Sequence, residues 1–448
     1  MSREERASPL GPLWGTAFLA SLPFAVLAFA LPIYGKMLGA SALQVGVLFS
    51  AVSFAPVLVR PFLGRMVDRW GRRPFILAGL VSYAASMALL ATAASVELLA
   101  IARLVQGLGQ ALFWLSAYTI VADVAHEWDR ARGFGAIDEA SSRGSLVGAL
   151  PGLVLVAVMQ ATGLPWQAVW PWLFGLYSVA AVAGLGLGAW RIGETGQPGP
   201  ARPVPHESDP TRHAPRRLSL QLIALMGIVF ITGASTAMVW PVLVVFIQDR
   251  LKVGPFQMAI AYLPAALVSS FLPSRIGRLT DRMARKPLMV AGLVTAGVAS
   301  AVMPRLRAVW PLAILWGVDS LGYAASSPAE RAFVADIAGR DRRGRSYGLY
   351  TFAYFLGAAL GPLAGGWLYD AMGQSYPFYG NSIVLGVAAL LLILLLREPA
   401  RNRAVRRPPG GQGSPPPQGR GPTPSQGRGS TPSQGRGPLQ SGGSLGSP

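Results

Sequence analysis

One charged stretch of the chain reads Gly64-Arg65-Met66-Val67-Asp68-Arg69-Trp70-Gly71-Arg72-Arg73-Pro74, and it joins two apolar runs that are each long enough to cross a bilayer. A second copy, Gly277-Arg278-Leu279-Thr280-Asp281-Arg282-Met283-Ala284-Arg285-Lys286-Pro287, begins 213 residues later, again between two apolar runs. The same offset carries Val121-Ala122-Asp123 onto Val334-Ala335-Asp336. The sequence therefore predicts two copies of one membrane unit, and internal duplication is typical of secondary transporters.

The composition is that of a membrane protein. Of the 448 residues, 52% are hydrophobic and 13% are charged, whereas soluble proteins carry about 25% charged residues. The net charge of +19 does not indicate a nucleic-acid partner, because the arginines cluster between apolar runs and in the tail, as membrane topology requires. Because there is no Cys and the three His are scattered, we expect no metal site and no cofactor.

Twelve stretches of the chain are long enough to cross a bilayer, since about 20 helical residues span its apolar core of about 30 Å. They are residues 12–34, 43–63, 74–94, 98–120, 134–158, 168–190, 219–246, 255–275, 287–304, 309–332, 346–369 and 378–397. We therefore predict an all-α integral membrane fold with twelve transmembrane helices in two pseudo-symmetric six-helix bundles.

The placement of arginine predicts the orientation of these helices. Alternate loops are rich in Arg, whereas the loops between them carry few charges. By the positive-inside rule we expect both termini and both charged stretches on the cytoplasmic face of the cell's inner (plasma) membrane. We expect five regions: a cytoplasmic N-terminus (1–11), a first bundle (12–190), a cytoplasmic linker (191–217), a second bundle (218–397) and a disordered tail rich in Pro, Gly, Ser and Arg (398–448).

The first charged stretch resembles the signature Gly-x-Leu-x-Asp-Arg-x-Gly-Arg-Arg/Lys of the major facilitator superfamily, with Met66 in place of the Leu. The likeness runs from about residue 12 to residue 397. The second copy departs from the pattern at Ala284, where a Gly is usual. We expect Gly64 to allow close packing of the predicted helix 43–63 on a neighbouring helix.

The resemblance implies a conformational latch. In the family the signature Asp lies near the N-terminal end of the eleventh helix, and the basic residue four positions later pairs with an acid that ends the fourth helix. These contacts would hold the two halves together on the cytoplasmic side while the outer face is open. The alternative is that the charges only set the topology. The implied latch residues are Gly64, Asp68, Arg69, Arg72 and Asp123 in the first half, and Asp281, Arg285 and Asp336 in the second half.

A second motif lies in the predicted helix 98–120. Its residues Arg103-Leu104-Val105-Gln106-Gly107-Leu108-Gly109 resemble the family motif Arg-x-x-Gln-Gly-x-Gly, whose Arg is linked to proton handling in antiporters. An unpaired Arg within hydrocarbon costs at least ~2.5 kcal/mol, so we expect Arg103 to face a cavity or a partner. At the positions of Arg103 and Gln106 the second half has Trp316 and Asp319, so the repeat breaks there.

Asp319 is our first candidate for a proton or substrate site. It lies roughly 15 Å into the predicted helix 309–332, near the middle of the bilayer. A carboxylate in a low-dielectric cavity can take up and release a proton when its surroundings change, and Arg103 is a candidate neighbour. The alternative is a structural carboxylate that is paired with another residue.

Other candidates begin the predicted helix 134–158. They are Asp138, Glu139 and Arg143. The spacing of four between Glu139 and Arg143 allows a self-neutralising pair on one helix face, which is as good an interpretation as a site. Trp240 and Tyr323 could line an amphipathic pocket, although each aromatic residue taken alone indicates a core position.

The predicted helix 346–369 carries the pattern Gly357-x-x-x-Gly361-Pro362-x-x-Gly365-Gly366. Small residues at this spacing allow close helix packing, and Pro gives a kink. In family members that export drugs by proton antiport, this pattern marks the fifth helix, where this chain has a degenerate version. The predicted helix 12–34 also has no acidic residue, although many exporters of the family carry one there. Both departures weaken the assignment to the antiporters.

Together these features predict a monomeric secondary transporter that works by alternating access, with proton-coupled efflux of small amphipathic or drug-like molecules as the preferred function. The alternative is a metabolite or sugar carrier, and a transporter-like sensor is a third interpretation. We expect no enzyme, because no nucleophile, metal cluster or acid–base pair gathers at a bilayer edge. The expected partners are a small-molecule substrate, a proton and the lipid bilayer.

Overall fold

The computed structural model describes residues 10–124, 130–195, 220–271, 285–338 and 343–396. All of them belong to one compact unit. The predicted disordered tail and most of the predicted linker therefore lie outside the described residues.

The described residues form helices and no strand. The first half contains α1 (Leu10–Ser21), α2 (Phe24–Met37), α3 (Ala42–Trp70), α4 (Arg73–Thr92), α5 (Val96–Val124), α6 (Arg130–Thr162) and α7 (Trp166–Arg191). The second half contains α8 (Leu220–Phe246), the π-helix η2 (Ile247–Leu251), α9 (Pro255–Phe271), α11 (Arg285–Val302), the 3-10 helix η3 (Met303–Arg305), α12 (Val309–Ala338), α13 (Arg343–Met372) and α14 (Tyr376–Leu395).

Eleven of the twelve predicted spans each correspond to one helix, and the remaining span, 12–34, corresponds to two helices, which confirms the all-α membrane fold. Ten of the described helical segments are long and apolar enough to cross a membrane. The other two are α9, which is described over 17 residues, and α12, which carries Asp319 within its apolar run. The duplication is visible in the helix starts, because α9, α12 and α13 begin 213 residues after α3, α5 and α6.

The first span differs from the prediction, because residues 12–34 do not form one helix. The structure has two helices, α1 and α2, which are interrupted at Leu22 and Pro23. Pro23 has no backbone N–H and so cannot continue the hydrogen-bond ladder of α1. A side chain at Gly148 of α6 would overlap the backbone of Leu22, so α6 passes directly against this interruption.

The helix α3 is longer than predicted and continues beyond residue 63 through most of the charged stretch. It ends at Gly71, whose φ of 91° is a conformation that glycine adopts readily. Charged residues can extend a helix past the bilayer, because water and side chains satisfy its polar groups there. The apolar run alone therefore underestimated the length of α3.

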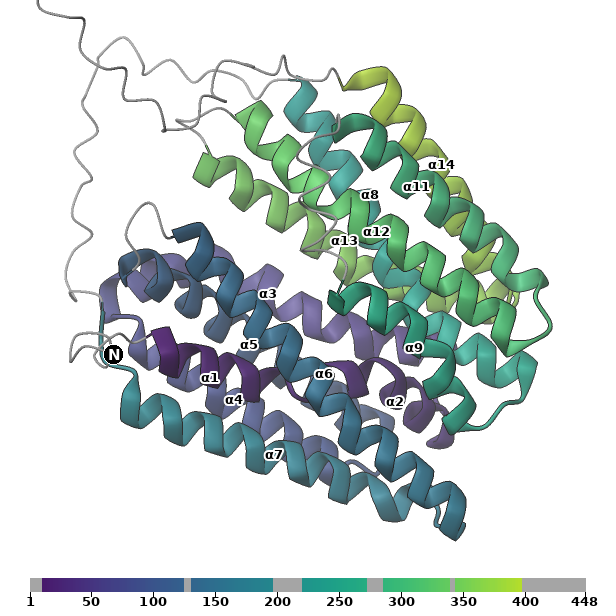
Figure 1. The fold of residues 1–448 in the computed structure, drawn as a ribbon, viewed down its shortest axis with the longest axis horizontal. Coiled ribbons are helices and arrows are strands. Elements are labelled where there is room, and N and C mark those ends of the chain that lie inside the picture. The colour runs from purple at the N-terminus through teal and green to yellow at the C-terminus, as the bar shows by residue number, and fades with distance from the viewer. Residues whose placement is uncertain (1–9, 125–129, 196–219, 272–284, 339–342, 397–448) are drawn as a thin grey trace, which may run out of the picture. The chain divides into compact units, whose positions relative to one another are not determined.

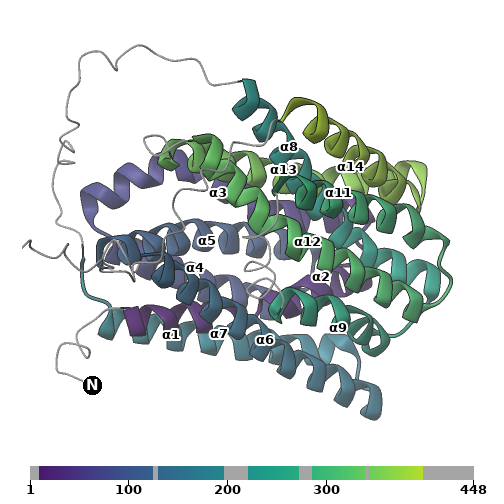
Figure 2. The same ribbon diagram turned by 45° about the horizontal axis from the view of Figure 1, so that its top comes forward.

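The two halves meet along α3 and α13 (Figure 1), and the turned view shows the same pair (Figure 2). The helix α13 also packs closely on α8 within its own half. A side chain at Gly357 or Gly361 would overlap backbone atoms of α8, so small residues let these two helices approach to backbone distance. Pro362 of α13 lies against Gly46 of α3 across the halves.

Candidate functional site

The loops between helices define two opposite sides of the helix bundles, which we call the Arg-rich side and the opposite side. The Arg-rich side carries the connection between α3 and α4, which includes Arg72. The opposite side carries the connection between α2 and α3, from Leu38 to Ser41.

A cavity of about 1790 Å³ lies between the two halves. Its first-half walls are Phe24 of α2 and parts of three helices, namely residues 56–61 of α3, 110–118 of α5 and 134–142 of α6. These parts of α3, α5 and α6 are the ones nearest the Arg-rich side. The second-half walls come mainly from α8, α11, α12 and α13. The two halves are therefore separated by the cavity toward the Arg-rich side and meet toward the opposite side.

Four of the predicted site residues line this cavity. They are Asp319, Asp138, Trp240 and Tyr323. Four others do not line it: Arg103, Gln106, Glu139 and Arg143.

Asp319 lies in the cavity wall one helical turn after Trp316. The carboxylate has no hydrogen bond or ion pair with any residue that the structure describes. Trp240 and Trp316 also line the cavity, and their ring centroids lie 5.1 Å apart; Trp240 lies 5.2 Å from Tyr262, measured in the same way. A carboxylate that no described residue neutralises, in a cavity with aromatic walls, suits a proton or a positively charged group.

Asp138 of α6 also faces the cavity, where it accepts a hydrogen bond of 2.6 Å from the hydroxyl of Tyr118 in α5. The next residue along, Glu139, forms an ion pair of 2.5 Å with Arg143, and these side chains are 61% and 70% exposed. Glu139 and Arg143 thus adopt the self-neutralising arrangement that their spacing allowed, away from the cavity.

Arg103 is buried inside the first half. Its Nε donates to the carbonyl of Leu48 at 3.1 Å, and a second nitrogen donates to Oε1 of Gln106. Arg103 and Gln106 line a separate small cavity of about 160 Å³. In this conformation Arg103 and Asp319 line different cavities, because Arg103 lies on the face of α5 that packs against α3 and α4.

Sequence reasoning missed Arg60. This residue of α3 lines the central cavity, and its guanidinium lies 4.2 Å from the ring centroid of Phe355 in α13, so it joins the two halves. Its Nε is buried without a hydrogen-bond partner in the described part of the chain. The sequence could have identified Arg60, because it lies within the predicted span 43–63. An unpaired Arg within hydrocarbon is costly, so Arg60, like Arg103, was to be expected at a cavity or beside a partner. Glu330 of α12, which also lines the cavity, was missed as well.

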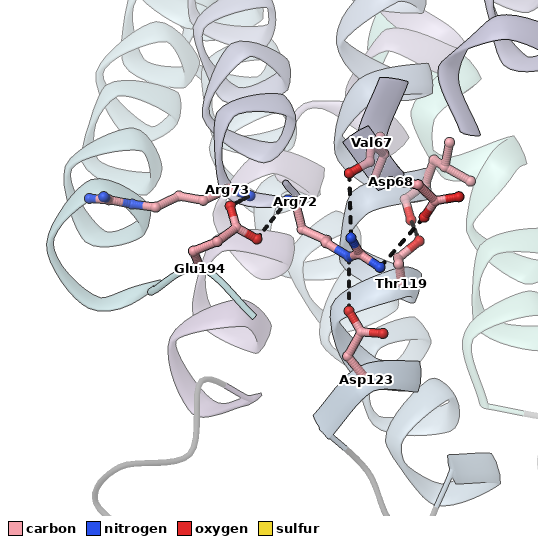
Figure 3. A network of polar contacts seen from close by, with 8 residues as sticks. Val67, Asp68, Arg72, Arg73, Thr119, Asp123 and Glu194 are labelled. Carbon is pink, nitrogen blue, oxygen red and sulfur yellow. Dashed lines mark hydrogen bonds and ion pairs between the residues drawn. The ribbon is translucent and has the colours of Figure 1, made fainter. Parts of the chain in front are cut away.

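The Arg-rich side is held by a network around Arg72 (Figure 3). The Arg72 guanidinium pairs with Asp123 at 2.9 Å and with Asp68 at 3.5 Å. Glu194, which the sequence did not single out, accepts the backbone N–H groups of Arg72 and Arg73 at 2.8 and 3.0 Å (Figure 3). All of these residues belong to the first half, so this network does not join the halves.

For the remaining predicted latch residues the structure describes no contact of the predicted kind. Arg69 lies exposed near the end of α3, and Arg285 begins α11. Asp281 and the side chain of Asp336 lie outside what the structure describes. The expectation for Gly64 is wrong in this conformation: a Cβ there would meet nothing within 4 Å, so no neighbouring helix packs closely against this position.

The opposite side is closed by contacts that do join the halves. The carboxylate of Asp370, near the end of α13, accepts the backbone N–H groups of Ala42 and Leu43 at 3.1 and 2.8 Å. A negative charge at the N-terminus of α3 is also favoured by the helix dipole. Lys36 pairs with Asp249 at 3.5 Å, and the hydroxyl of Tyr369 donates to Asp249 at 2.8 Å.

The Major Facilitator Superfamily model matches residues 13–272 and 225–433 of the chain. The chain therefore belongs to the major facilitator superfamily and is a multi-pass membrane transporter.

Among curated proteins it is 23% identical over 390 residues to "Uncharacterized MFS-type transporter YhjO" of Bacillus subtilis (strain 168), covering 87% of this chain and 93% of that protein. It is 26% identical over 421 residues to "Multidrug resistance protein MdtH" of Enterobacter sp. (strain 638), covering 92% of this chain and 100% of that protein. Among solved structures, the nucleoside transporter NupG matches with a TM-score of 0.69 at 12% identity, covering 87% of this chain and 100% of that chain.

Proposed function

We propose that the protein is a proton-coupled exporter of small amphipathic or drug-like molecules that works by alternating access in the plasma membrane. The Arg-rich side faces the cytoplasm in this proposal, as the distribution of arginine favours. One chain forms both the cavity and the contacts that join the halves on the opposite side, which supports a transporter that works as a monomer.

The observation that carries the proposal is the central cavity itself. It is large enough for a drug-sized molecule, and its walls combine aromatic and aliphatic side chains with a few charged groups. Such walls favour substrates that have an apolar body and one or two polar groups. The likeness to a multidrug resistance protein over nearly the whole chain supports the same substrate class.

Asp319 is the proposed coupling residue. It faces the cavity, and among the described residues nothing neutralises its carboxylate. A proton or a positively charged substrate group can therefore occupy it in turn, and competition between the two couples export to proton entry. Asp138 is the second choice, because it also faces the cavity but already accepts the hydroxyl of Tyr118.

Alternating access is supported by the contrast between the two sides. The halves touch on the side of Asp370 and Lys36, and the cavity separates them toward the side of Arg72. A transporter that rocks between two closures needs contacts that break on one side as they form on the other. The conformation described here is the one open toward the proposed cytoplasmic side.

A metabolite carrier is the second candidate function. It is favoured by the hydroxyl groups that α8 presents to the cavity, those of Thr232, Ser235 and Thr236, and by the amide of Asn381. These groups suit a polar substrate such as a nucleoside. The likeness in fold to the nucleoside transporter NupG raises the same possibility.

The test uses the full chain in proteoliposomes with an imposed pH gradient. We expect uphill movement of a lipophilic dye in the parent protein. In Asp319→Asn, which changes one oxygen to NH2, we expect binding to persist while pH-driven transport falls about 100-fold or more, the range typical of lost proton transfer. The matched control is Glu139→Gln on the exposed face of α6, which should transport like the parent.

Two results would contradict this proposal. An Asp319→Asn variant that pumps dye normally would exclude Asp319 as the coupling residue. A parent protein that moves uridine but no lipophilic dye would favour the metabolite carrier instead.

A further inference from the structure

The Arg103 guanidinium is a buried charge for which the described residues supply no counter-charge. The side chain is 6% exposed and lies seven residues into α5, about 10 Å along the helix axis. Its two hydrogen-bond acceptors, the carbonyl of Leu48 and Oε1 of Gln106, are both neutral. A guanidinium has five N–H groups, so donors remain that these two acceptors do not satisfy. Burial of an unpaired charge is costly, which calls for an anion nearby.

No carboxylate of the surrounding helices supplies this anion. The small cavity beside Arg103 is lined by α2, α3, α4 and α5, and neither α2 nor α4 contains Asp or Glu. On α3 the acid is Asp68, which pairs with Arg72 at the Arg-rich end. On α5, Glu97 is exposed and Asp123 pairs with Arg72. The helices that line the cavity therefore place no acid beside Arg103.

Tyr83 provides an independent sign of a missing ligand. The side chain of Tyr83 is 1% exposed and lines the same small cavity. Its hydroxyl donates no hydrogen bond in the described part of the chain, because the one group that approaches it, the indole N–H of Trp114, is itself a donor. A buried hydroxyl that donates to nothing is destabilising, so such groups normally have a partner. Gln106 uses its oxygen for Arg103, which leaves its NH2 group as a further donor.

We propose that this small cavity is a binding site for a small monovalent anion, held by the Arg103 guanidinium, the Tyr83 hydroxyl and the Gln106 amide. The anion is either a free halide or the carboxylate group of a small organic molecule. The volume of about 160 Å³ accommodates a halide with a few waters, each of which takes about 30 Å³ in the liquid. Phe24 and Gln110 line both cavities, so the small cavity adjoins the central one.

This site goes beyond the proposed export function, because it requires neither a transported substrate nor proton coupling. Anion binding would neutralise Arg103 and tie α4 to α5 through Tyr83 and Gln106. It would therefore stabilise the first half in a way that unfolding experiments detect without any transport assay.

The test measures thermal unfolding of the purified full chain while sodium chloride or sodium acetate replaces sodium gluconate at constant ionic strength. We expect a saturable rise in Tm with at least one of the two small anions, since gluconate is too bulky for the cavity. A response to chloride alone identifies a free halide, and a response to acetate alone identifies a carboxylate group. A response to both assigns the site to small monovalent anions of either kind.

The key variant is Tyr83→Phe, which keeps the ring and removes only the hydroxyl. We expect it to weaken the apparent Kd for the active anion by about tenfold, the effect of one hydrogen bond to a charged group. The matched control is Tyr177→Phe in the same half, whose hydroxyl donates to the carbonyl of Gly148 at 2.6 Å. That control should lower Tm equally in all three salts and leave the anion response intact.

Either of two results would overturn the proposal. One is a parent protein whose Tm is the same in chloride, acetate and gluconate. The other is Tyr83→Phe with an unchanged anion response, because the hydroxyl would then not contact the anion. Without an anion, removal of a buried hydroxyl that donates to nothing should be neutral or stabilising in every salt. Arg103→Lys, which keeps the charge but loses the planar fork, supplies a second variant with the same expected weakening.

Discussion

Each end of the α3–α13 pair carries an aspartate, and the two aspartates have different partners. Asp370 near the end of α13 binds the backbone N–H groups of Ala42 and Leu43 that begin α3, so it links the two halves. Asp68 near the end of α3 is 55% exposed and binds Arg72 of its own half. One carboxylate is thus engaged across the halves while the other is not, although both lie on the same pair of helices.

In a mechanism of alternating access, as proposed, this difference would let one side of the transporter open while the other closes. A hydrogen bond to a charged group contributes about 1.5–3 kcal/mol, so the two bonds of Asp370 favour closure of the opposite side. Release of Asp370 would remove that preference, and engagement of Asp68 with the second half would replace it. In this account Asp370 stabilises closure of the opposite side, and Asp68 in the family signature stabilises closure of the Arg-rich side.

The largest expected effect comes from the close approach of α3 and α13. A Cβ at Gly46 would overlap the carbonyl of Pro362, so Gly46→Ala must push the two helices apart on the opposite side. Overpacking of this kind costs typically about 1–3 kcal/mol. We expect the closed opposite side to lose population by about tenfold or more, which labelling of single cysteines on that side would measure.

The matched control lies on the same helix. Gly64→Ala adds the same methyl group where nothing lies within 4 Å, so the conformation described here should tolerate it. Equal effects of the two substitutions would mean that backbone contact between α3 and α13 does not close the opposite side.

An intermediate effect is expected from Asp370→Asn. The amide keeps one acceptor oxygen but loses the charge that favours the N-terminus of α3. We expect a shift of about tenfold toward the state that is open on the opposite side, since charged hydrogen bonds are roughly twice as strong as neutral ones. Asp68→Asn should shift the population in the reverse direction. Shifts of the same sign in both variants would contradict the comparison between the two ends.

The smallest effect is expected from Lys36→Gln. The Lys36–Asp249 pair is 3.5 Å long and its side chains are 28% and 25% exposed. Such pairs contribute about 0–1 kcal/mol, which corresponds to a shift of less than about fivefold. The shift should become smaller still at high salt. A salt-independent effect larger than that of Asp370→Asn would mean that the Lys36–Asp249 pair contributes more to closure than Asp370 does.

The sequence predicted the helices well because long apolar runs, duplicated in one register, determine where spans begin and end. It also indicated Arg72 and Asp123, which now lie 2.9 Å apart, because a motif with a known geometry carried them. The interruption at Pro23 was missed because the apolar run continues through it unchanged.

Contacts between distant segments could not be predicted in the same way. Asp370 and Leu43 are separated by 327 residues, and no local pattern links a carboxylate at one helix end to bare N–H groups at another. Gly64 shows a second limit: the motif led us to expect close packing, whereas in this conformation a Cβ at Gly64 would meet nothing within 4 Å.

The central claim is that the two sides close in opposition. Since the chain has no Cys, paired spin labels can be introduced cleanly at the exposed positions Met37→Cys and Ala371→Cys on the opposite side, and at Arg69→Cys and Leu395→Cys on the Arg-rich side. The measurement compares both label distances in the parent and in Asp370→Asn, with the protein in lipid nanodiscs. The account predicts that in the variant the distance on the opposite side lengthens while the distance on the Arg-rich side shortens. A variant in which both distances lengthen together, or in which neither changes, would contradict it.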